Sequence, residues 1–451
     1  MKSHYKIFSL FIILLICLAA CTPQSSTPTE PASPETAATT PPEATPEASL
    51  SGAPSEPAQP VTVTFWYPYG EGSWTGDFLA QKISEFNEAN PDIVVEGQSY
   101  QDYASIIEGV QRAAAGKNLP SIATIGFGYD DYIINSGLAQ PLNPLLGDNA
   151  DAFLQDFYPT LLQVTTRDGV VYGIPLALSV AEIFYFPDLF EQAGLDPENP
   201  PQTWEEFIVA ANTIHEKLGI YGATFALDDP WILETAIRSN GAELLSEDGK
   251  TANLDSETAI KVLSDWGDGA ANGSILYNAD FMQTLQSFGA KQVAMFAVSS
   301  YGTVYYHDSL PEVKAMAFPA GEGYTFKSPA GGNSLYVLGN DDAERAAAMK
   351  FIEFLSSPEA NAEWAENSGY LPTRASSLEV MADFIEGFDN YKLAVDAINN
   401  VVPPTQWPSR HALQINQILM QAIEGVMLGQ MPADEALSQA NKQINALLAQ
   451  Q

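Results

Sequence analysis

The chain has 451 residues, which is too long for one hydrophobic core and predicts two lobes. Hydrophobic residues make up 46% of the chain, so a sizeable core can form. The formal net charge is −37, from 19 basic and 56 acidic residues, and such a field repels nucleic acids and anionic lipid headgroups. The charge therefore argues against nucleic-acid binding.

The first twenty residues predict a secretory signal. Lys2 and Lys6 precede an apolar run over 7–20 that is too short to span a membrane comfortably. Leu18-Ala19-Ala20-Cys21 resembles a bacterial lipobox, which implies that Cys21 is lipidated, becomes the first residue of the mature chain and anchors it outside the cytoplasm. The alternative is an ordinary cleaved signal, residues 1–20, followed by a chance cysteine.

The remaining chain up to Pro60 predicts a disordered tether. Residues 21–60 are rich in Pro, Thr, Ser, Ala and Glu and hold almost no large apolar side chain, so they cannot form a core. Cys17 and Cys21 are the only cysteines. The sequence after the tether therefore excludes disulfides, cysteine nucleophiles and cysteine-ligated zinc.

The folded region begins with an α/β pattern. Residues 61–66 alternate and are β-branched, as in a strand, and a helical stripe over 78–86 follows. Second and third strands are predicted at 93–96 and 120–125. This order predicts a parallel sheet, whose ligands lie beyond the carboxyl ends of its strands.

The loops that follow these three strands carry aromatic and polar side chains. Each of these residues alone is also explained by packing, but their shared position at strand ends predicts that they contact a ligand. The candidates are Trp66, Tyr67, Trp74, Tyr100, Tyr129 and Asp130.

A compact succession of elements runs from residue 331 to 374. Gly331 and Gly332 allow close backbone approach before a predicted strand, and helices follow from Asp342 and from Ser357. Gly369 ends the second helix, which leaves Tyr370 in a short loop before a proline. Tyr370 either anchors this loop to its own core or contacts a ligand.

This stretch resembles the signature of the family 1 extracellular solute-binding proteins of ABC importers, in which a Gly-Gly strand, a helix near Ser-Pro-Glu and Gly-Tyr-Leu-Pro recur in that order. The resemblance covers residues 61–448 and implies a two-lobe α/β fold of the periplasmic-binding-protein type, with discontinuous lobes, a hinge and an interlobe ligand cleft. The implied lobes are 61–170 with 315–345 and 171–314 with 346–451. The glycine pair and the tyrosine are implied to face the cleft.

The same resemblance implies further ligand contacts. Relatives offer a hydroxyl near Ser179, an aromatic platform near Trp231, a small-residue loop that contains Ser300 and Tyr301, and an arginine near Arg410. Trp231 is equally explained as a core residue. The implied ligand-binding set is completed by these five residues together with Gly331, Gly332 and Tyr370.

Catalytic and metal signatures are absent from the sequence. The histidines His215, His307 and His411 are scattered without a second ligand at metal spacing, and there is no Gly-x-Ser-x-Gly elbow and no phosphate loop. No catalytic residue, metal or cofactor is therefore predicted. The 56 carboxylates leave a glycosidase-like acid pair open.

The sequence favours a monomeric, lipid-anchored binding protein that delivers a carbohydrate, specifically an oligosaccharide, to the permease subunits of an ABC transporter. Glycerol 3-phosphate or glycerophosphodiesters are an alternative ligand, because Tyr100, Ser179, Gly331, Gly332 and Tyr370 match that branch. Phe127 and Tyr67 depart from it, where a glutamate and a histidine are usual. Two other classes also stay open: a secreted polysaccharide hydrolase or lyase, and an adhesin.

Overall fold

The computed structural model describes residues 59–70, 72–339 and 341–450. The predicted signal, Cys21 and nearly all of the predicted tether lie outside these residues. In the described part, the first strand begins at Val61, where the change in composition predicts the start of the folded region. Within these ranges, every helix is too short or too polar to cross a membrane.

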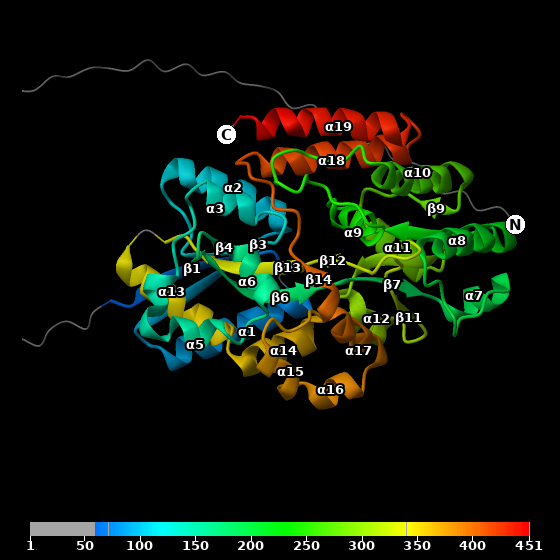
Figure 1. Cartoon of the computed structure of the whole chain (residues 1–451). Helices are drawn as coiled ribbons and strands as arrows, with labels where there is room; N and C mark the ends of the chain where they lie inside the picture. Colours follow the sequence, from blue (N-terminus) through cyan, green and yellow to red (C-terminus); the bar gives the residue numbers. More distant parts are fainter. Residues whose placement is uncertain (1–58, 71, 340, 451) are drawn as a thin grey trace, which may run out of the picture. The chain divides into compact units, whose positions relative to one another are not determined.

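The first sheet has five strands in the order β2-β1-β3-β13-β6 (Figure 1). β1 pairs in parallel with its neighbours β2 and β3, while β13 is antiparallel to both β3 and β6. The predicted parallel arrangement is therefore confirmed for the first three strands, and β13 makes the sheet mixed. The strands are β1 Val61–Tyr67, β2 Ile93–Ser99, β3 Ile122–Gly126, β6 Gly173–Ser179 and β13 Gly331–Val337.

Helices α1 Trp74–Ala89, α2 Tyr103–Gly116, α13 Asp342–Leu355 and α14 Pro358–Ser368 accompany this sheet. In each of them a polar side chain at the N-cap accepts a hydrogen bond from the backbone of the first turn, which satisfies an otherwise unpaired donor. The capping residues are Ser73, Asp102, Asp341 and Ser357.

The second sheet also has five strands, in the order β11-β7-β10-β8-β9, of which β7, β9 and β11 are labelled in Figure 1. β7 is antiparallel to β10 and β11, and β8 is parallel to β10 and β9. Hydrophobic side chains from this sheet and its helices form a core separate from that of the first sheet. The strands are β7 Ala181–Tyr185, β8 Tyr221–Phe225, β9 Ile275–Leu276, β10 Val293–Ser299 and β11 Lys314–Ala317.

The helices that pack on the second core include α8 Trp204–Leu218, α10 Glu257–Asn272, α18 Ala412–Met427 and α19 Ala433–Leu448. A capping box starts α8, because Thr203 and Glu206 exchange side-chain hydrogen bonds with each other's backbone. The last two helices, orange and red in Figure 1, pack against each other and against α10.

The first sheet with its helices is here called lobe 1, and the second sheet with its helices is called lobe 2. Three segments connect the two lobes. Val180 alone separates β6 from β7. β12 Ser328–Pro329 leads from β11 to β13, and β14 Val401–Val402 precedes α18. β12 and β14 pair in parallel, so two of the three connections form one small sheet.

Strand pairing corrects the expected lobe boundaries. β6, which was expected to lie in lobe 2, belongs to the first sheet, and β11 pairs within the second. α13 contacts β1 and α14 contacts α1, so residues 346–368 also accompany lobe 1. A run of apolar residues such as 173–179 identifies a fully buried strand, but it cannot tell which sheet the strand joins.

Candidate functional site

A cavity of about 510 Å³, here called the cleft, is lined by residues of both lobes. It lies at the carboxyl ends of β1, β3 and β6 and at the amino end of β13, the edge that the parallel pattern predicts. Eight of the fourteen predicted ligand contacts line it: Trp74, Tyr129, Ser179, Trp231, Tyr301, Gly331, Gly332 and Tyr370.

Trp74 enters the cleft from the first residue of α1. The Ser73 hydroxyl donates to the carbonyl of Gly70 at 2.6 Å and accepts from the backbone of Gly76 at 3.1 Å. A Cβ atom on Gly76 would come 2.2 Å from the Gly70 carbonyl oxygen, so only glycine fits there. This tight turn fixes Trp74, whose ring stacks on Tyr301 with centroids 5.8 Å apart.

Tyrosine hydroxyls form a hydrogen-bonded cluster on the lobe 1 side. The side-chain amide of Asn333 donates to the hydroxyls of Tyr69 and Tyr103, each at 2.8 Å. The hydroxyls of Tyr103 and Tyr370 lie 3.3 Å apart. Burial raises the pKa of Tyr370 well above its ordinary value, so the tyrosine cluster presents uncharged hydroxyls to the cleft.

A glycine places Tyr370 against lobe 2. Gly369 ends α14 with a φ of 83°, which confirms the predicted helix stop. A Cβ atom there would approach the Tyr301 carbonyl oxygen to 2.5 Å. Because the two backbones meet so closely, the rings of Tyr301 and Tyr370 pack with centroids 4.6 Å apart.

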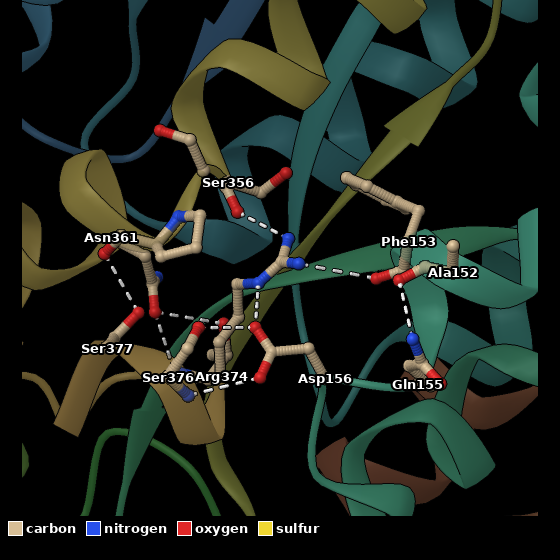
Figure 2. Close-up of polar contacts among 12 residues, drawn as sticks. Ala152, Phe153, Gln155, Asp156, Ser356, Asn361, Arg374, Ser376 and Ser377 are labelled. Carbon is tan, nitrogen blue, oxygen red and sulfur yellow. Dashed lines mark hydrogen bonds and ion pairs between the residues drawn. The ribbon is translucent and has the colours of Figure 1, made fainter. Parts of the chain in front are cut away.

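An arginine network holds the loop that carries Tyr370. Arg374 donates to Asp156 at 2.7 Å through Nε and to the carbonyl of Ser356 at 2.8 Å, as Figure 2 shows. Asp156 also accepts from the hydroxyl and backbone of Ser376. Only 8% of the Arg374 side chain is exposed, so this ion pair is shielded from solvent. Sequence reasoning did not assign Arg374 this anchoring role.

Trp231 faces the cleft from lobe 2, at the start of α9 Trp231–Ser239. Its indole nitrogen donates to the carbonyl of Pro329 at 2.9 Å, and its backbone donates to Asp229 at 2.8 Å. The ring lies over Gly331, where a Cβ atom would come 2.8 Å from Trp231 and 2.4 Å from the Ser179 hydroxyl. The missing side chain at Gly331 thus makes room for two other cleft residues.

Position 332 requires glycine for a different reason. Its φ is 111°, and a Cβ atom would lie 2.2 Å from the carbonyl oxygen of Ala177 on the neighbouring strand β6. Backbone access to a ligand was the expected role of both glycines. Packing within the protein accounts for both of them.

Carboxyl groups gather on the lobe 2 side. Asp228, Asp229 and Glu234 line the cleft, and Asp102 faces it from lobe 1. Burial, reinforced by the charge of Asp228, raises the pKa of Asp229 to about 7, and burial also raises the pKa of Asp228. The sequence prediction missed this pair, although Asp228 and Asp229 come directly before Pro230 and Trp231 in the same loop.

The cleft lining contains no lysine, arginine or histidine among residues 59–70, 72–339 and 341–450. Phosphate and carboxylate groups are normally recognised by arginine forks, lysines or helix amino termini. The amino ends of α1, α2 and α9 do reach the lining, so an anion could use backbone donors there but would also meet the carboxyl groups. A neutral or cationic solute would meet no such repulsion.

Four predicted contacts lie in packed surroundings away from the cleft. Trp66 packs against Tyr100 with centroids 4.9 Å apart and the rings tilted by 43°, beside the core next to α2. Tyr67 is 6% exposed, because the last position of β1 points into the core under α1. Asp130 is 2% exposed and accepts a short hydrogen bond from the hydroxyl of Tyr336.

Ser300 and Arg410 also lie outside the cleft lining. Ser300 is fully buried, and its hydroxyl accepts from the backbone of Val180 at 3.2 Å, so it stabilises the connection between the lobes. Arg410 is exposed to solvent. The expected ligand arginine thus does not reach the cleft in this structure.

A family model described as bacterial extracellular solute-binding protein matches residues 81–388. The chain belongs to this family. The sn-glycerol-3-phosphate-binding periplasmic protein UgpB of Salmonella typhimurium is 27% identical over 424 residues, covering 86% of this chain and 92% of the relative. UgpB of Escherichia coli is 26% identical over 425 residues, with the same coverage.

Solved structures confirm the expected two-lobe solute-binding fold. The acarbose-binding GacH receptor of Streptomyces glaucescens matches with a TM-score of 0.76 at 21% identity, covering 87% of this chain and 99% of that one. A substrate-binding protein from Listeria monocytogenes in complex with cycloalternan matches with a TM-score of 0.77 at 18% identity, covering 87% of this chain and 100% of that one. UgpB of Mycobacterium tuberculosis in complex with glycerophosphocholine matches with a TM-score of 0.76 at 18% identity, covering 86% of this chain and 98% of that one.

Proposed function

We propose that this protein captures an oligosaccharide outside the cytoplasm and delivers it to the permease subunits of an ABC importer. The observation that carries the ligand class is the composition of the cleft. Aromatic rings from Trp74, Trp231 and Tyr301 lie beside tyrosine hydroxyls and carboxyl groups. A sugar offers apolar ring faces for such aromatic groups and hydroxyls for such polar groups. Two solved relatives of this fold are described with oligosaccharide-type ligands.

Solute capture would use both sides of the cleft. Sugar rings would stack on Trp231 and Trp74, while sugar hydroxyls would donate to Asp228 and Asp229 and exchange hydrogen bonds with the tyrosine cluster. The three connecting segments are positioned to act as a hinge, so that bound solute favours approach of the lobes. The closed form would then present the surface that a permease recognises.

Glycerophosphodiesters are a second candidate, favoured by the sequence relatives named for glycerol 3-phosphate. The cleft argues against a free phosphate, because an anion would meet carboxyl groups and no cationic side chain among the described residues. A choline ester would fit better, since a quaternary ammonium group is attracted by aromatic rings and carboxylates. Trp231 and Asp229 provide that pair.

Anchoring through lipidated Cys21 and action as a single chain complete the proposal. The predicted signal and tether would hold the binding domain close to the membrane that contains the permease. Replacement of Cys21 by serine is expected to release the protein from the membrane fraction. Unchanged membrane association of Cys21→Ser would contradict lipid anchoring.

A thermal-shift and calorimetric screen of the purified protein tests the ligand class. The probes are mono- and oligosaccharides, glycerol 3-phosphate and glycerophosphocholine. We expect an oligosaccharide to raise the melting temperature and to be recovered unchanged by chromatography. A response to the phosphate compounds alone would favour the second candidate, and shortened glycan products would indicate a hydrolase. No response to any probe would favour an adhesin.

A further inference from the structure

A second cavity, here called the outer cavity, adjoins the cleft. Its volume is about 730 Å³, which lies in the range of small-molecule sites. Trp74 and Tyr305 line both cavities. The rest of the outer cavity comes from α12 Gly302–Ser309, α14 and the region of α16 Ala382–Glu386. Residues of both lobes therefore surround a space that continues beyond the cleft.

A row of aromatic rings connects the two spaces. Trp74 stacks on Tyr301 at 5.8 Å and on Tyr305 at 6.0 Å, with interplanar angles of 17° and 16°. Trp74 is nevertheless 40% exposed, so part of its indole stays available to a ligand. Tyr301 lines the cleft alone, and Tyr305 lines both cavities, so the row leads from one to the other.

The outer cavity repeats the chemistry of the cleft. Phe384 and Phe388 supply apolar rings, and Asn367, Asp383 and Glu366 supply polar groups. Burial and the charge of Glu363 raise the pKa of Glu366 above its ordinary value. Lysine and arginine are absent from the described residues of this lining as well, but unlike the cleft it includes a histidine, His307. Aromatic rings beside amide and carboxyl groups suit a carbohydrate in both places.

We propose that the outer cavity is an additional subsite for the same carbohydrate chain, whose distal sugar units pass over Trp74 and Tyr305 to reach Phe384, Asn367 and Asp383. This inference rests on the proposed function. The cleft would bind one end of an oligosaccharide, and the outer cavity would add affinity only for chains long enough to extend past Trp74. The protein would thus select its ligand by length.

Calorimetry with linear oligosaccharides of two to seven units tests this inference. The probes are α-1,4-linked glucose, β-1,4-linked glucose and β-1,4-linked xylose oligomers. For the series that binds, affinity should rise with length and then level off. Asn367→Ala and Asp383→Asn should weaken binding of the longest chain by about five- to tenfold and leave the shortest binding chain unchanged. Both side chains are exposed, so the fold should survive.

Asp389→Asn serves as the matched control, because Asp389 is exposed at the start of the next helix and lines neither cavity. It should bind all chain lengths as the unmodified protein does. Equal affinity for short and long chains, or equal losses at every length in the outer-cavity variants, would overturn the additional subsite while the proposed function stands. Failure of all three series to bind would overturn both.

Discussion

The two walls of the cleft differ in charge. Lobe 1 contributes Tyr69, Tyr103 and Tyr370, whose hydroxyls form a network with Asn333 and stay neutral, and one carboxyl group, that of Asp102. Lobe 2 contributes Asp228 and Asp229, which have no cationic neighbour among the described residues of the lining. The difference suggests a division of labour, in which the tyrosine cluster of lobe 1 offers a fixed neutral surface and the carboxyl pair of lobe 2 supplies acceptors for donor groups of the solute.

The largest effect is expected where the two walls meet. Gly369→Ala would strain a residue with positive φ and push a Cβ atom against the Tyr301 carbonyl oxygen. Relief requires that the Tyr370 loop move away from Tyr301, so we expect a loss of about 2–4 kcal/mol in the free energy of unfolding. Chemical denaturation measures this loss. Gly116→Ala, at an open helix end, is the control and should be nearly neutral.

Removing the aromatic platform of lobe 2 should have the next largest effect. Trp231→Ala deletes the ring that faces the cleft and the hydrogen bond to Pro329, so the affinity for the best oligosaccharide should fall about 30- to 100-fold. Trp231→Phe should retain part of that affinity. Trp66→Phe, which alters a tryptophan outside the cleft, should bind normally in the same calorimetric assay. Full affinity in Trp231→Ala would contradict the site.

The lobe 2 wall with Asp228 and Asp229, here called the acidic wall, should make stability depend on pH. The tyrosine cluster of lobe 1, here called the neutral wall, should not. Asp229 has a raised pKa of about 7 when folded, so the folded protein retains a proton that the unfolded chain releases near pH 4. Its contribution to stability is therefore present at low pH and is lost as the pH rises through about 7. The melting temperature should fall between pH 5 and pH 8, and in Asp229→Asn this fall should be smaller by about 2–4 °C.

The Asp229→Asn variant keeps an acceptor for the backbone of Trp231, so the ring should stay in place. Asp131, which pairs with Arg167 and has a raised pKa of about 6, also contributes to the pH dependence. It is unchanged in the variant, so the difference between the two profiles reports the Asp228–Asp229 pair, whose two carboxyl groups titrate together. Identical profiles would show that the acidic wall is not protonated in the folded protein.

The neutral wall should respond weakly to loss of a single hydroxyl. Tyr370→Phe removes the contact with Tyr103 but preserves the ring packing on Tyr301, so oligosaccharide affinity should decrease about two- to fivefold. Tyr324→Phe is the control, because Tyr324 is exposed and lines neither cavity. If Tyr370→Phe and Trp231→Ala both bound normally, the proposed site would be excluded.

Local sequence patterns predicted much of this arrangement. The strand at 61–66 and the helix stop at Gly369 depend on neighbouring residues, and the structure contains both. Long-range pairing was not predictable in this way. Tyr103 and Tyr370 are 267 positions apart, and the position of β6 in the first sheet depends on its pairing with β13. The pattern of aromatic residues at strand ends could not separate Trp74, which lines the cleft, from Trp66, which does not.

The smallest effect is expected for the residue with the strongest apparent chemistry. Arg410 offers a donor fork suited to phosphate or paired hydroxyls, but it is exposed and lies outside the cleft lining. Arg410→Ala should change oligosaccharide affinity less than twofold, since surface charges contribute little at physiological ionic strength. The measurement also separates the two ligand candidates. A large loss of glycerophosphocholine binding in Arg410→Ala would mean that lobe approach brings this arginine to an anion, and the neutral and acidic walls would then not define the whole site.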